Sequence, residues 1–560
     1  MTAPRFLCTL SIVLLLALPS RAWDFHVPWL ERPISLRLWE TLFIDYHDDN
    51  FDGRQENDEY YDLGSRLNLR LDAGKFFASM RADVNAFFDT PQGAVPPYKN
   101  RFGLEKWSAG WRGRSFRIEA GDFYSTFGRG IALSIRKVDQ IGQDTTIMGA
   151  KVKAAFGDAS VVAFSGLLNP TNFDSVSEKL VSDWMPSDSW YATRGDWLSG
   201  ARLNWNAADG MRLSGHAVAL WSDPYGRNER LQSLIQMGVL QRWATIGGAE
   251  LDWYGLSDFL GLNVEVDWLH KRLGGVGGTK EGIGLLAGAN FQLGDWTIVA
   301  EAKHYDKYDL YTVTDGGDYL PVRIDIVSPP TLEPPEMEVA NNHTVSGGRV
   351  KVSWRPAAGA TMLEAAYAGF WQRATATSED RAWVYNVWLT IEQGFLGSGL
   401  ANCRLGWREE VPRAAGGLLH NTLYAFYSAS VPLGARHSLE LSGNVWYGRK
   451  HNPVLDTGKT YVKGDASFGY GFSPLLTAAV VVGFDNEVTG SGNLDVFYTP
   501  VGGRPIRQVF LAGSLSLNFS GTVVVNLLGG QLRGGAKCIN GLCRIYPPFA
   551  GVRAEVKVRF

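Results

Sequence analysis

Two small groups of residues have the types and spacing to bind a metal ion or to form a covalent link. The first alternates carboxylate and amide side chains along one loop, and its members are Asp48, Asn50, Asp52 and Glu59. With a glycine at position 53, this spacing matches the oxygen ligands and the turn of a calcium-binding loop. However, Gln55 stands where that pattern has an aliphatic residue, and the loop connects two predicted strands. A structural calcium site and a solvated acidic loop are therefore alternative interpretations.

The second group is a pair of cysteines, Cys538 and Cys543, within a predicted loop that covers residues 534–548. Export to an oxidising compartment would allow them to form a disulfide, which would close and stiffen a small loop. A metal site is not expected here, because no histidine lies nearby in the sequence. We predict a Cys538–Cys543 disulfide.

Residues for catalysis are not grouped in the sequence. The nine histidines are scattered, and neither a G-x-S-x-G motif nor a paired metal-ligand spacing occurs. A formal net charge of −3 gives no basic surface for nucleic acid. We therefore expect neither an enzyme nor a nucleic-acid-binding protein, and no cofactor apart from the calcium ion considered above.

The first 22 residues predict a signal peptide. Arg5 supplies a positive charge, residues 6–19 form an apolar run, and Ser20 and Ala22 are small residues at the two cleavage-site positions. The run is too short to cross a bilayer core of about 30 Å as a helix. We expect cleavage after Ala22, followed by a short periplasmic segment, residues 23–33.

Beyond the signal peptide, no stretch of about 18 uncharged apolar residues occurs. A membrane-embedded chain would then have to be a closed β-barrel, because backbone groups in lipid need internal partners. A large soluble secreted β-protein is the alternative. From Ile34 onward apolar and polar residues alternate with period two, as in Leu262–Trp268, where Val264 and Val266 alternate with Glu265 and Asp267.

The polar face of these strands would line the lumen of a barrel. Its predicted pore-lining residues are Arg66, Arg70, Arg81, Asp83, Glu265, Asp267, Glu301, Lys303, Arg349, Lys351, Lys463, Asp465, Arg553, Glu555 and Lys557. Both signs of charge are present in similar numbers, so strong selectivity for anions or cations is not predicted. The alternative role of these charges is to pair across strands and solvate the wall.

Short turns and long loops alternate along the chain. The short turns include residues 72–75, 111–115, 155–159, 206–211, 292–296, 356–360, 432–436 and 518–521, and the long loops include 47–58, 123–143, 169–196, 223–242 and 305–344. Short periplasmic turns and long extracellular loops are typical of outer-membrane barrels, and a soluble sandwich has no reason to keep this rhythm. We predict an all-β, transmembrane, antiparallel up-and-down barrel over residues 34–560, with about 24 strands and a range of roughly 20–26. Tryptophans near the predicted strand ends, Trp446 among them, are expected at the membrane interface.

The last strand carries a sharp pattern. Its apolar face is Val552, Ala554, Val556, Val558 and Phe560, and charged residues occupy the other face. This alternation, ending on an aromatic residue, resembles the C-terminal assembly signal of outer-membrane barrels. The resemblance implies that the barrel-assembly machinery and outer-membrane lipid are partners, and that the protein lies in the outer membrane of a Gram-negative bacterium.

Residues 121–130 read GDFYSTFGRG, and glycines permit a chain that turns sharply inward. The position of residues 123–143 resembles the constriction loop that folds into the lumen of general porins. The candidate constriction residues are Asp122, Tyr124, Phe127, Arg129, Arg136 and Lys137. Residues 120–152 also resemble a motif of an uncharacterised family of Gram-negative outer-membrane barrels, with the pattern G-D-F-Y-x-x-F-G-x-G. That resemblance implies location and fold but no activity. An external loop packed on its neighbours is the alternative.

We expect a porin-like channel for passive or loop-gated passage of small solutes. About 24 strands would enclose a wide lumen, which long loops must narrow. No plug domain is expected before Ile34, which argues against an energised transporter. The alternative function is a surface receptor or structural barrel that its own loops plug. Residues 306–342, with two Pro-Pro pairs, could fold over the mouth, display a binding surface or form a mobile polar loop. The sequence does not indicate an oligomeric state.

Overall fold

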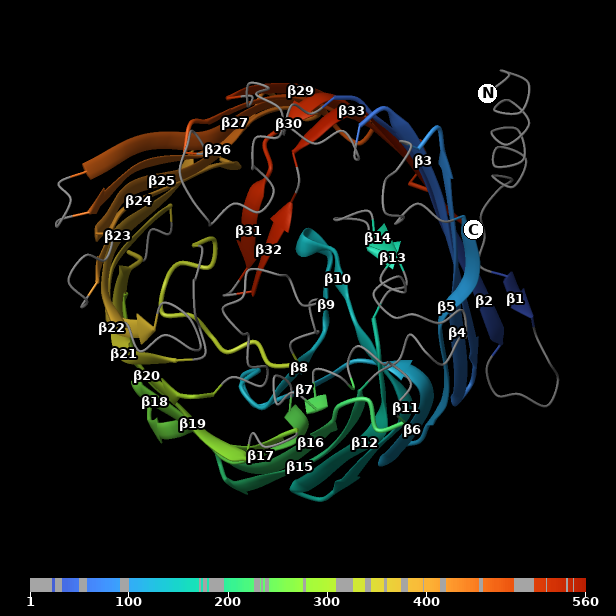
Figure 1. The fold of residues 1–560 in the computed structure, drawn as a ribbon, viewed down its shortest axis with the longest axis vertical. Coiled ribbons are helices and arrows are strands. Elements are labelled where there is room, and N and C mark those ends of the chain that lie inside the picture. The colour runs from blue at the N-terminus through green and yellow to red at the C-terminus, as the bar shows by residue number, and fades with distance from the viewer. Residues whose placement is uncertain are drawn as a thin grey trace.

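The alternation of apolar and polar side chains builds strands in this chain, because successive residues on a strand face opposite sides of the sheet. Within the part of the chain that the computed structural model describes, 24 strands pair antiparallel with both neighbours and close into a barrel (Figure 1). The described residues are 23–25, 33–49, 58–90, 100–170, 173–174, 179–180, 196–225, 232, 235–236, 241–274, 278–308, 326–337, 344–356, 360–373, 381–395, 397–412, 419–452, 457–487, 508–519, 521–539, 542–546 and 548–560.

The barrel strands follow one another around the ring in chain order. They are β2 (Ile34–His47), β3 (Tyr60–Ala73), β4 (Phe76–Phe88), β5 (Arg101–Arg112), β6 (Phe116–Phe123), β11 (Thr146–Phe156), β12 (Ala159–Asn169), β15 (Trp197–Ala208), β16 (Met211–Trp221), β17 (Gln241–Ser257), β18 (Leu260–Leu273), β19 (Thr279–Leu293), β20 (Trp296–Asp306), β21 (Val345–Trp354), β22 (Thr361–Arg373), β23 (Arg381–Phe395), β24 (Gly399–Pro412), β25 (Leu419–Pro432), β26 (His437–Asn452), β27 (Thr457–Phe472), β28 (Leu476–Asp485), β29 (Val509–Phe519), β30 (Val523–Leu532) and β33 (Phe549–Arg559). This closed antiparallel barrel confirms the predicted fold class and strand number.

The first and last barrel strands close the ring. β2 pairs with β33 from Trp39↔Arg559 to His47↔Gly551, and the backbone N–H of Phe560 donates to the carbonyl of Leu38 at 2.7 Å. A short strand, β1 (Trp23–Phe25), pairs with the beginning of β2. The barrel therefore has no free edge along its wall, which removes the unpaired backbone groups that an open sheet would present.

Short connections lie at one end of the barrel and longer ones at the other. β11 and β12 pair up to Phe156↔Ala159, and β3 and β4 pair up to Ala73↔Phe76, so their turns are tight. The longer connections carry the small elements β7 (Ser125–Phe127), β8 (Leu133–Ile135), β9 (Lys137–Val138), the 3-10 helix η1 (Asp139–Ile141), β10 (Gln143–Asp144), β13 (Phe173–Asp174), β14 (Lys179–Leu180), β31 (Gly535–Ile539) and β32 (Leu542–Tyr546). Figure 1 shows β7–β10 and the β31–β32 hairpin inside the ring of strands.

Large apolar side chains cover the outside of the barrel. Val266 and Trp268 of β18 and Val350 of β21 are exposed, whereas Glu265 and Asp267, which alternate with them, are buried. The interface position expected for Trp446 is wrong, because this side chain packs beside buried Tyr424 on the inner face. The parity of β26 decides this, because Val445 and Tyr447, on either side of Trp446, are the exposed residues. Among the described residues, no helix is long and apolar enough to cross a membrane.

Candidate functional site

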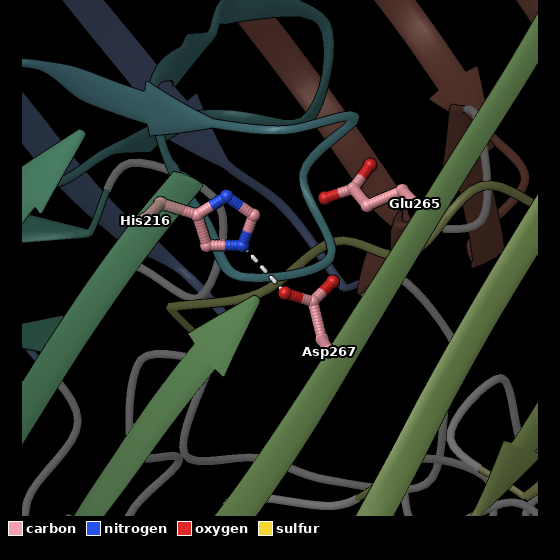
Figure 2. A group of neighbouring side chains, drawn as sticks. All are labelled: His216, Glu265 and Asp267. Carbon is pink, nitrogen blue, oxygen red and sulfur yellow. Dashed lines mark hydrogen bonds and ion pairs between the residues drawn. The ribbon is translucent and has the colours of Figure 1, made fainter. Parts of the chain in front are cut away.

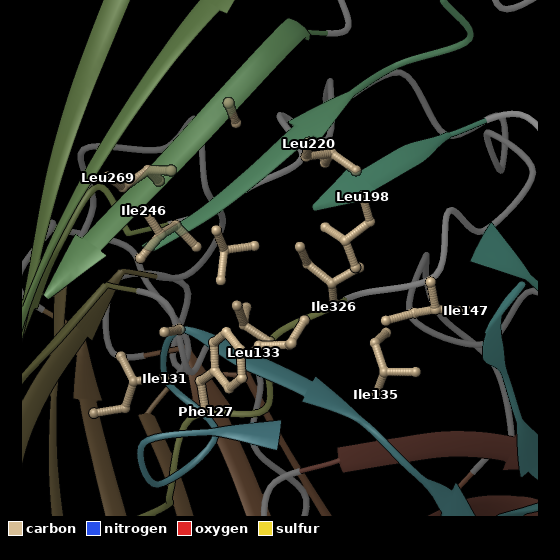
Figure 3. Close-up of a cluster of buried hydrophobic side chains, with 14 of the residues drawn as sticks. Phe127, Ile131, Leu133, Ile135, Ile147, Leu198, Leu220, Ile246, Leu269 and Ile326 are labelled. Carbon is tan, nitrogen blue, oxygen red and sulfur yellow. The ribbon is translucent and has the colours of Figure 1, made fainter. Parts of the chain in front are cut away.

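The chain between β6 and β11, residues 124–145, runs inside the barrel and is called the inner loop here. β6 and β11 pair directly at Phe123↔Ile147, so the inner loop leaves the wall and returns at neighbouring positions. Five of its apolar side chains are buried in one cluster, which also contains inward-facing residues of β12 and of β15–β20 (Figure 3). The members contributed by the inner loop are Phe127, Ile131, Ala132, Leu133 and Ile135. Each large side chain buried in this way contributes roughly 1.5–3 kcal/mol to holding the loop inside.

A second piece of chain, residues 326–337, continues this filling and is called the inner segment. The backbone N–H of Ser134 donates to the carbonyl of Ile326 at 2.6 Å, and that of Ser328 donates to the carbonyl of Gly130 at 2.8 Å. Ile326 and Val327 also belong to the apolar cluster of the inner loop. The inner loop and the inner segment therefore form one packed unit within the barrel.

The inner segment is tied to the wall on its other side by buried polar contacts. Glu333 is fully buried and accepts hydrogen bonds from Arg408 Nε at 2.6 Å and from Asn386 Nδ2 at 3.2 Å. Lys303 Nζ donates to the carbonyl of Pro330 at 2.7 Å. Hydrogen bonds to charged groups in a dry interior are strong, so these contacts fix the inner segment against β20, β23 and β24.

At the end of the inner loop, Asp144 clamps it to the wall formed by β4 and β5. The carboxylate of Asp144 accepts hydrogen bonds from Arg81 Nη1 at 2.7 Å and from Lys106 Nζ at 2.5 Å, and also from the Tyr124 hydroxyl. Burial alone would raise the pKa of Asp144, but Lys106, Tyr124 and Arg81 outweigh it and lower the pKa to about 2. Burial and the Asp144 charge raise the pKa of Tyr124, so its hydroxyl stays protonated and remains a donor.

Beneath the inner loop lies a group of three side chains, the His216 cluster, made of His216 on β16 and of Glu265 and Asp267 on β18 (Figure 2). His216 Nε2 and Asp267 Oδ1 are 2.5 Å apart. Glu265 Oε2 accepts a hydrogen bond from the backbone N–H of Arg129 at 2.8 Å. The Arg129 side chain reaches Asp252 at 3.1 Å, so the tip of the inner loop is fixed to β17 and β18.

A cavity of about 450 Å³ lies between the inner loop and the wall and is called the basic cavity. Its lining includes the cationic side chains Arg136, Lys137, Lys151, Lys153 and Arg202, together with Tyr124, Phe127 and Asn204, and it contains no carboxylate. Two of these cations form ion pairs with acids that do not line the cavity: Lys137 pairs with Asp139, and Arg202 pairs with Glu250. Among the described residues the other three form no ion pair, so the cavity is electropositive.

The predicted pore-lining charges lie on the inward face of their strands, and most of them are used in ion pairs. The pairs are Arg66–Asp83, Arg70–Asp72, Arg81–Asp83, Arg349–Glu301, Lys351–Glu364, Lys463–Glu487, Arg533–Asp465, Arg553–Asp45 and Lys557–Glu555. Glu265 and Lys303 are instead occupied by the inner loop and the inner segment. Such pairs leave little net charge along most of the wall.

The predicted constriction residues are brought together only in part. Tyr124 and Asp122 lie near the clamp, where Asp122 accepts hydrogen bonds from Thr146 and Asn169. Phe127 is in the apolar cluster, Arg129 binds Asp252, and Arg136 and Lys137 line the basic cavity.

Sequence reasoning missed the residues at which these groups converge. They are Lys106, Asp144, Lys151, Lys153, Arg202, His216, Asp252, Glu333 and Arg408. The same alternation that selected Glu265 extends to His216, Lys151 and Lys153, because each faces inward from its own strand. The spacing of residues along the chain could not identify His216 as part of a site, because its partners Glu265 and Asp267 belong to another strand.

The calcium and disulfide predictions fall partly on residues that the structure does not describe. Asn50 and Asp52 lie outside the described residues, so the ligand set with Asp48 and Glu59 stays a prediction. The backbone register places Cys538 opposite Cys543 in the β31–β32 hairpin, while their side chains lie outside the described part. The hairpin also reaches the inner loop, because the Tyr546 hydroxyl donates to the carbonyl of Gln140 at 2.9 Å.

Comparisons with known proteins give one family match and several similar folds. Residues 34–170 match a family described as a family of unknown function (DUF6029). No curated protein matches the sequence of this chain. Among solved structures, the chain is similar to a BenF-like porin from Pseudomonas fluorescens Pf-5, with 11% identity and a TM-score of 0.35 over 67% of this chain and 93% of that one. It is also similar to the siderophore receptor PirA from Pseudomonas aeruginosa, with 9% identity and a TM-score of 0.46 over 96% of this chain and 81% of that one. The copper transporter OprC gives 10% identity and a TM-score of 0.46 over the same shares of the two chains.

Proposed function

We propose that this protein is an outer-membrane channel whose lumen the inner loop narrows to a passage for small solutes. A barrel with an apolar outer face and a polar inner face is suited to a bilayer, because its strands pair with one another around the closed wall. The predicted signal peptide and the alternation of β33 support export and insertion by the barrel-assembly machinery. In this orientation the short connections face the periplasm and the long ones face outward.

The docking of the inner loop is the observation that carries this proposal. Barrels of about 16–18 strands already hold an aqueous channel, so 24 strands would leave a wide hole unless something filled it. The inner loop and the inner segment fill part of that width, and apolar packing and buried ion pairs hold them there. A passage narrowed by fixed internal segments admits small solutes and retains large ones.

The basic cavity supports a preference for small anions within this proposal. Like charges confined in one cavity repel each other, and a carboxylate or phosphate occupant would relieve that repulsion while accepting hydrogen bonds from Lys and Arg. Most of the predicted pore-lining charges are paired, so the basic cavity contributes a local excess of positive charge to the inner face. This differs from the absence of selectivity that the wall residues alone predict.

The reversal potential of the purified full chain in a planar bilayer under a potassium chloride gradient tests this function. We expect ion-conducting events with chloride preferred over potassium. Replacing both Lys151→Glu and Lys153→Glu should shift the reversal potential toward potassium. A control with Arg70→Glu and Lys557→Glu makes the same change in net charge on the inner face outside the basic cavity, and it should shift the potential less. Equal shifts in the two variants would contradict the role of the basic cavity.

The alternative function is a barrel plugged by its own loops that serves as a surface receptor or a structural element. The observation that favours it is the extent of internal docking, since the β31–β32 hairpin also contacts the inner loop. A folded, inserted wild type without conductance would support this alternative over the channel.

A further inference from the structure

The His216 cluster combines the donor atoms that transition metals prefer. One imidazole and two carboxylates bring one ligand atom each to within 4.8 Å of one another. The side chains of His216 and Asp267 have no exposed area, and Glu265 is equally buried. These residues come from β16 and β18, which lie on either side of β17.

A glycine on the intervening strand makes room for this convergence. The register aligns His216, Gly248 and Asp267 across three neighbouring strands. A Cβ atom at Gly248 would lie 1.9 Å from Asp267 Oδ1 and 2.6 Å from His216 Nε2. Any side chain at this position would therefore occupy the space between the two ligands.

The cluster has more acceptor atoms than the protein supplies with donors. Among the described residues, Glu265 Oε1, Asp267 Oδ2 and His216 Nδ1 are buried without a hydrogen-bond partner. Arg129, whose backbone binds Glu265, uses its guanidinium for another acid, Asp252, which Arg212 also binds. Two buried carboxylates without a neutralising cation are costly, and a bound cation would remove much of that cost.

We propose that the His216 cluster binds one divalent transition-metal ion of the zinc type. Calcium prefers six to eight oxygen ligands, whereas an imidazole with two carboxylates is a donor set that zinc accepts. Zinc–ligand distances of about 2.0–2.2 Å place tetrahedral ligand atoms roughly 3.3 Å apart. The His216 Nε2–Asp267 Oδ1 pair, now 2.5 Å apart, would open by roughly 1 Å, and ligand atoms farther apart than this spacing would close toward the ion. An ion bound at Nε2 would leave the ring hydrogen of His216 on Nδ1, which has no other partner among the described residues, and three protein ligands leave one tetrahedral position for water.

The inner loop is coupled to this site. Gly128 lies directly over the site, because a Cβ atom there would be 1.7 Å from Glu265 Oε1, and it also lines a neighbouring cavity of about 400 Å³. Glu265 also accepts the hydrogen bond from the backbone of Arg129. An ion on Glu265 would hold that carboxylate in place and so strengthen the contact between the inner loop and the wall.

Zinc binding by the purified full chain tests the site without reference to transport. The protein is stripped with a chelator, equilibrated with zinc alone and dialysed, and its zinc content is measured by mass spectrometry. We expect one zinc per chain. Asp267→Asn, which keeps the side-chain size, should lower zinc affinity by about 10-fold or more, the usual scale for losing one ligand-sphere contact. Asp62→Asn is the matched control, because Asp62 is also a buried acid but lies on β3, away from β16–β18.

The visible absorption spectrum of bound cobalt provides a second measurement. It would stay the same in Asp267→Asn if Asp267 only stabilised the fold and did not bind the metal. We expect the visible absorption of four-coordinate cobalt in the wild type and in Asp62→Asn, and its loss in Asp267→Asn. Heat-dependent migration in gel electrophoresis reports whether each variant has folded. A folded wild type that retains no zinc, or equal zinc binding by both variants, would overturn the proposal while leaving the channel function open.

Discussion

At the scale of single residues, the glycines of GDFYSTFGRG let the inner loop approach both the wall and the inner segment. Gly128 and Gly130 have φ values of 60° and 89°, a region that favours glycine. A Cβ atom at Gly128 would lie 1.7 Å from Glu265 Oε1, and one at Gly130 would lie 2.9 Å from the carbonyl of Ser328. Close backbone approach, as well as a sharp turn, therefore requires glycine here.

Gly128→Ala should loosen the inner loop and raise single-channel conductance, because the new methyl group must displace either Glu265 or the loop. Gly157→Ala is its matched control. Gly157 has a similar φ of 56° but nothing within 4 Å of a Cβ atom, so it carries the conformational cost alone, about 1–2 kcal/mol. Conductance traces of the two variants compare the effects directly. The same conductance in both would show that the close contact at Gly128 does not hold the loop.

The sequence predicts which wall residues face inward but not what they contact. Glu265 and Lys303 are found from alternation alone, because the parity of a strand is local. Their partners, the backbone of Arg129 and the carbonyl of Pro330, come from chain far away in sequence. The pairing of such groups depends on how the long connections fold, and no local pattern encodes it.

At the scale of elements, the inner loop is held by two different forces. The apolar cluster fixes β7 and β8 against β12 and β15–β20, whereas Asp144 of β10 fixes the return of the loop to β4 and β5. Apolar packing is insensitive to pH, but the clamp depends on the charge of Asp144. The two contributions can therefore be separated by titration.

Acid should release the clamp. The pKa of Asp144 is lowered to about 2 in the folded protein from a usual value of 3.8, so its stabilisation is complete above about pH 4 and is lost as the pH falls toward 2. A shift of this size corresponds to roughly 2–3 kcal/mol. We expect wild-type conductance to be constant from pH 7 to about pH 4 and to rise below that.

Other acids titrate in the same pH range. One is Glu487, because Lys463 and Lys450 outweigh the effect of its burial and lower its pKa to about 2. The variant Asp144→Asn separates the effect of the clamp from the effect of these acids. This variant lacks the charge at every pH, so its conductance should already be high at pH 7 and change little on acidification. A wild-type rise that persists unchanged in Asp144→Asn would place the pH effect elsewhere.

The inner segment shows the limit of sequence reasoning at this scale. Its prolines predict an extended, stiff stretch. From the sequence alone, this stretch could cover the mouth of the barrel, display a binding surface or form a mobile loop. The structure places residues 326–337 inside the barrel, where Glu333 meets Arg408 and Asn386. These partners belong to β24 and β23, which follow later in the chain, so only the assembled barrel brings them together.

At the scale of the whole molecule, the barrel itself could be predicted from the sequence. Period-two alternation gives the strands, the rhythm of short and long connections gives the up-and-down order, and the total length limits the strand number. The sequence predicts that residues 123–143 fold inward, but it does not predict the contacts that join the inner loop, the inner segment and the walls. Those contacts place two internal segments within the wide ring of strands.

The most direct test of this account is the single-channel conductance of the wild type beside a variant that lacks residues 125–140. Phe123 and Ile147 are paired neighbours, so the shortened connection can still close the hairpin between β6 and β11. The account predicts small, steady conductance steps for the wild type and steps that are several-fold larger for the variant. Equal conductance from two folded and inserted proteins would contradict the claim that the inner loop narrows the lumen.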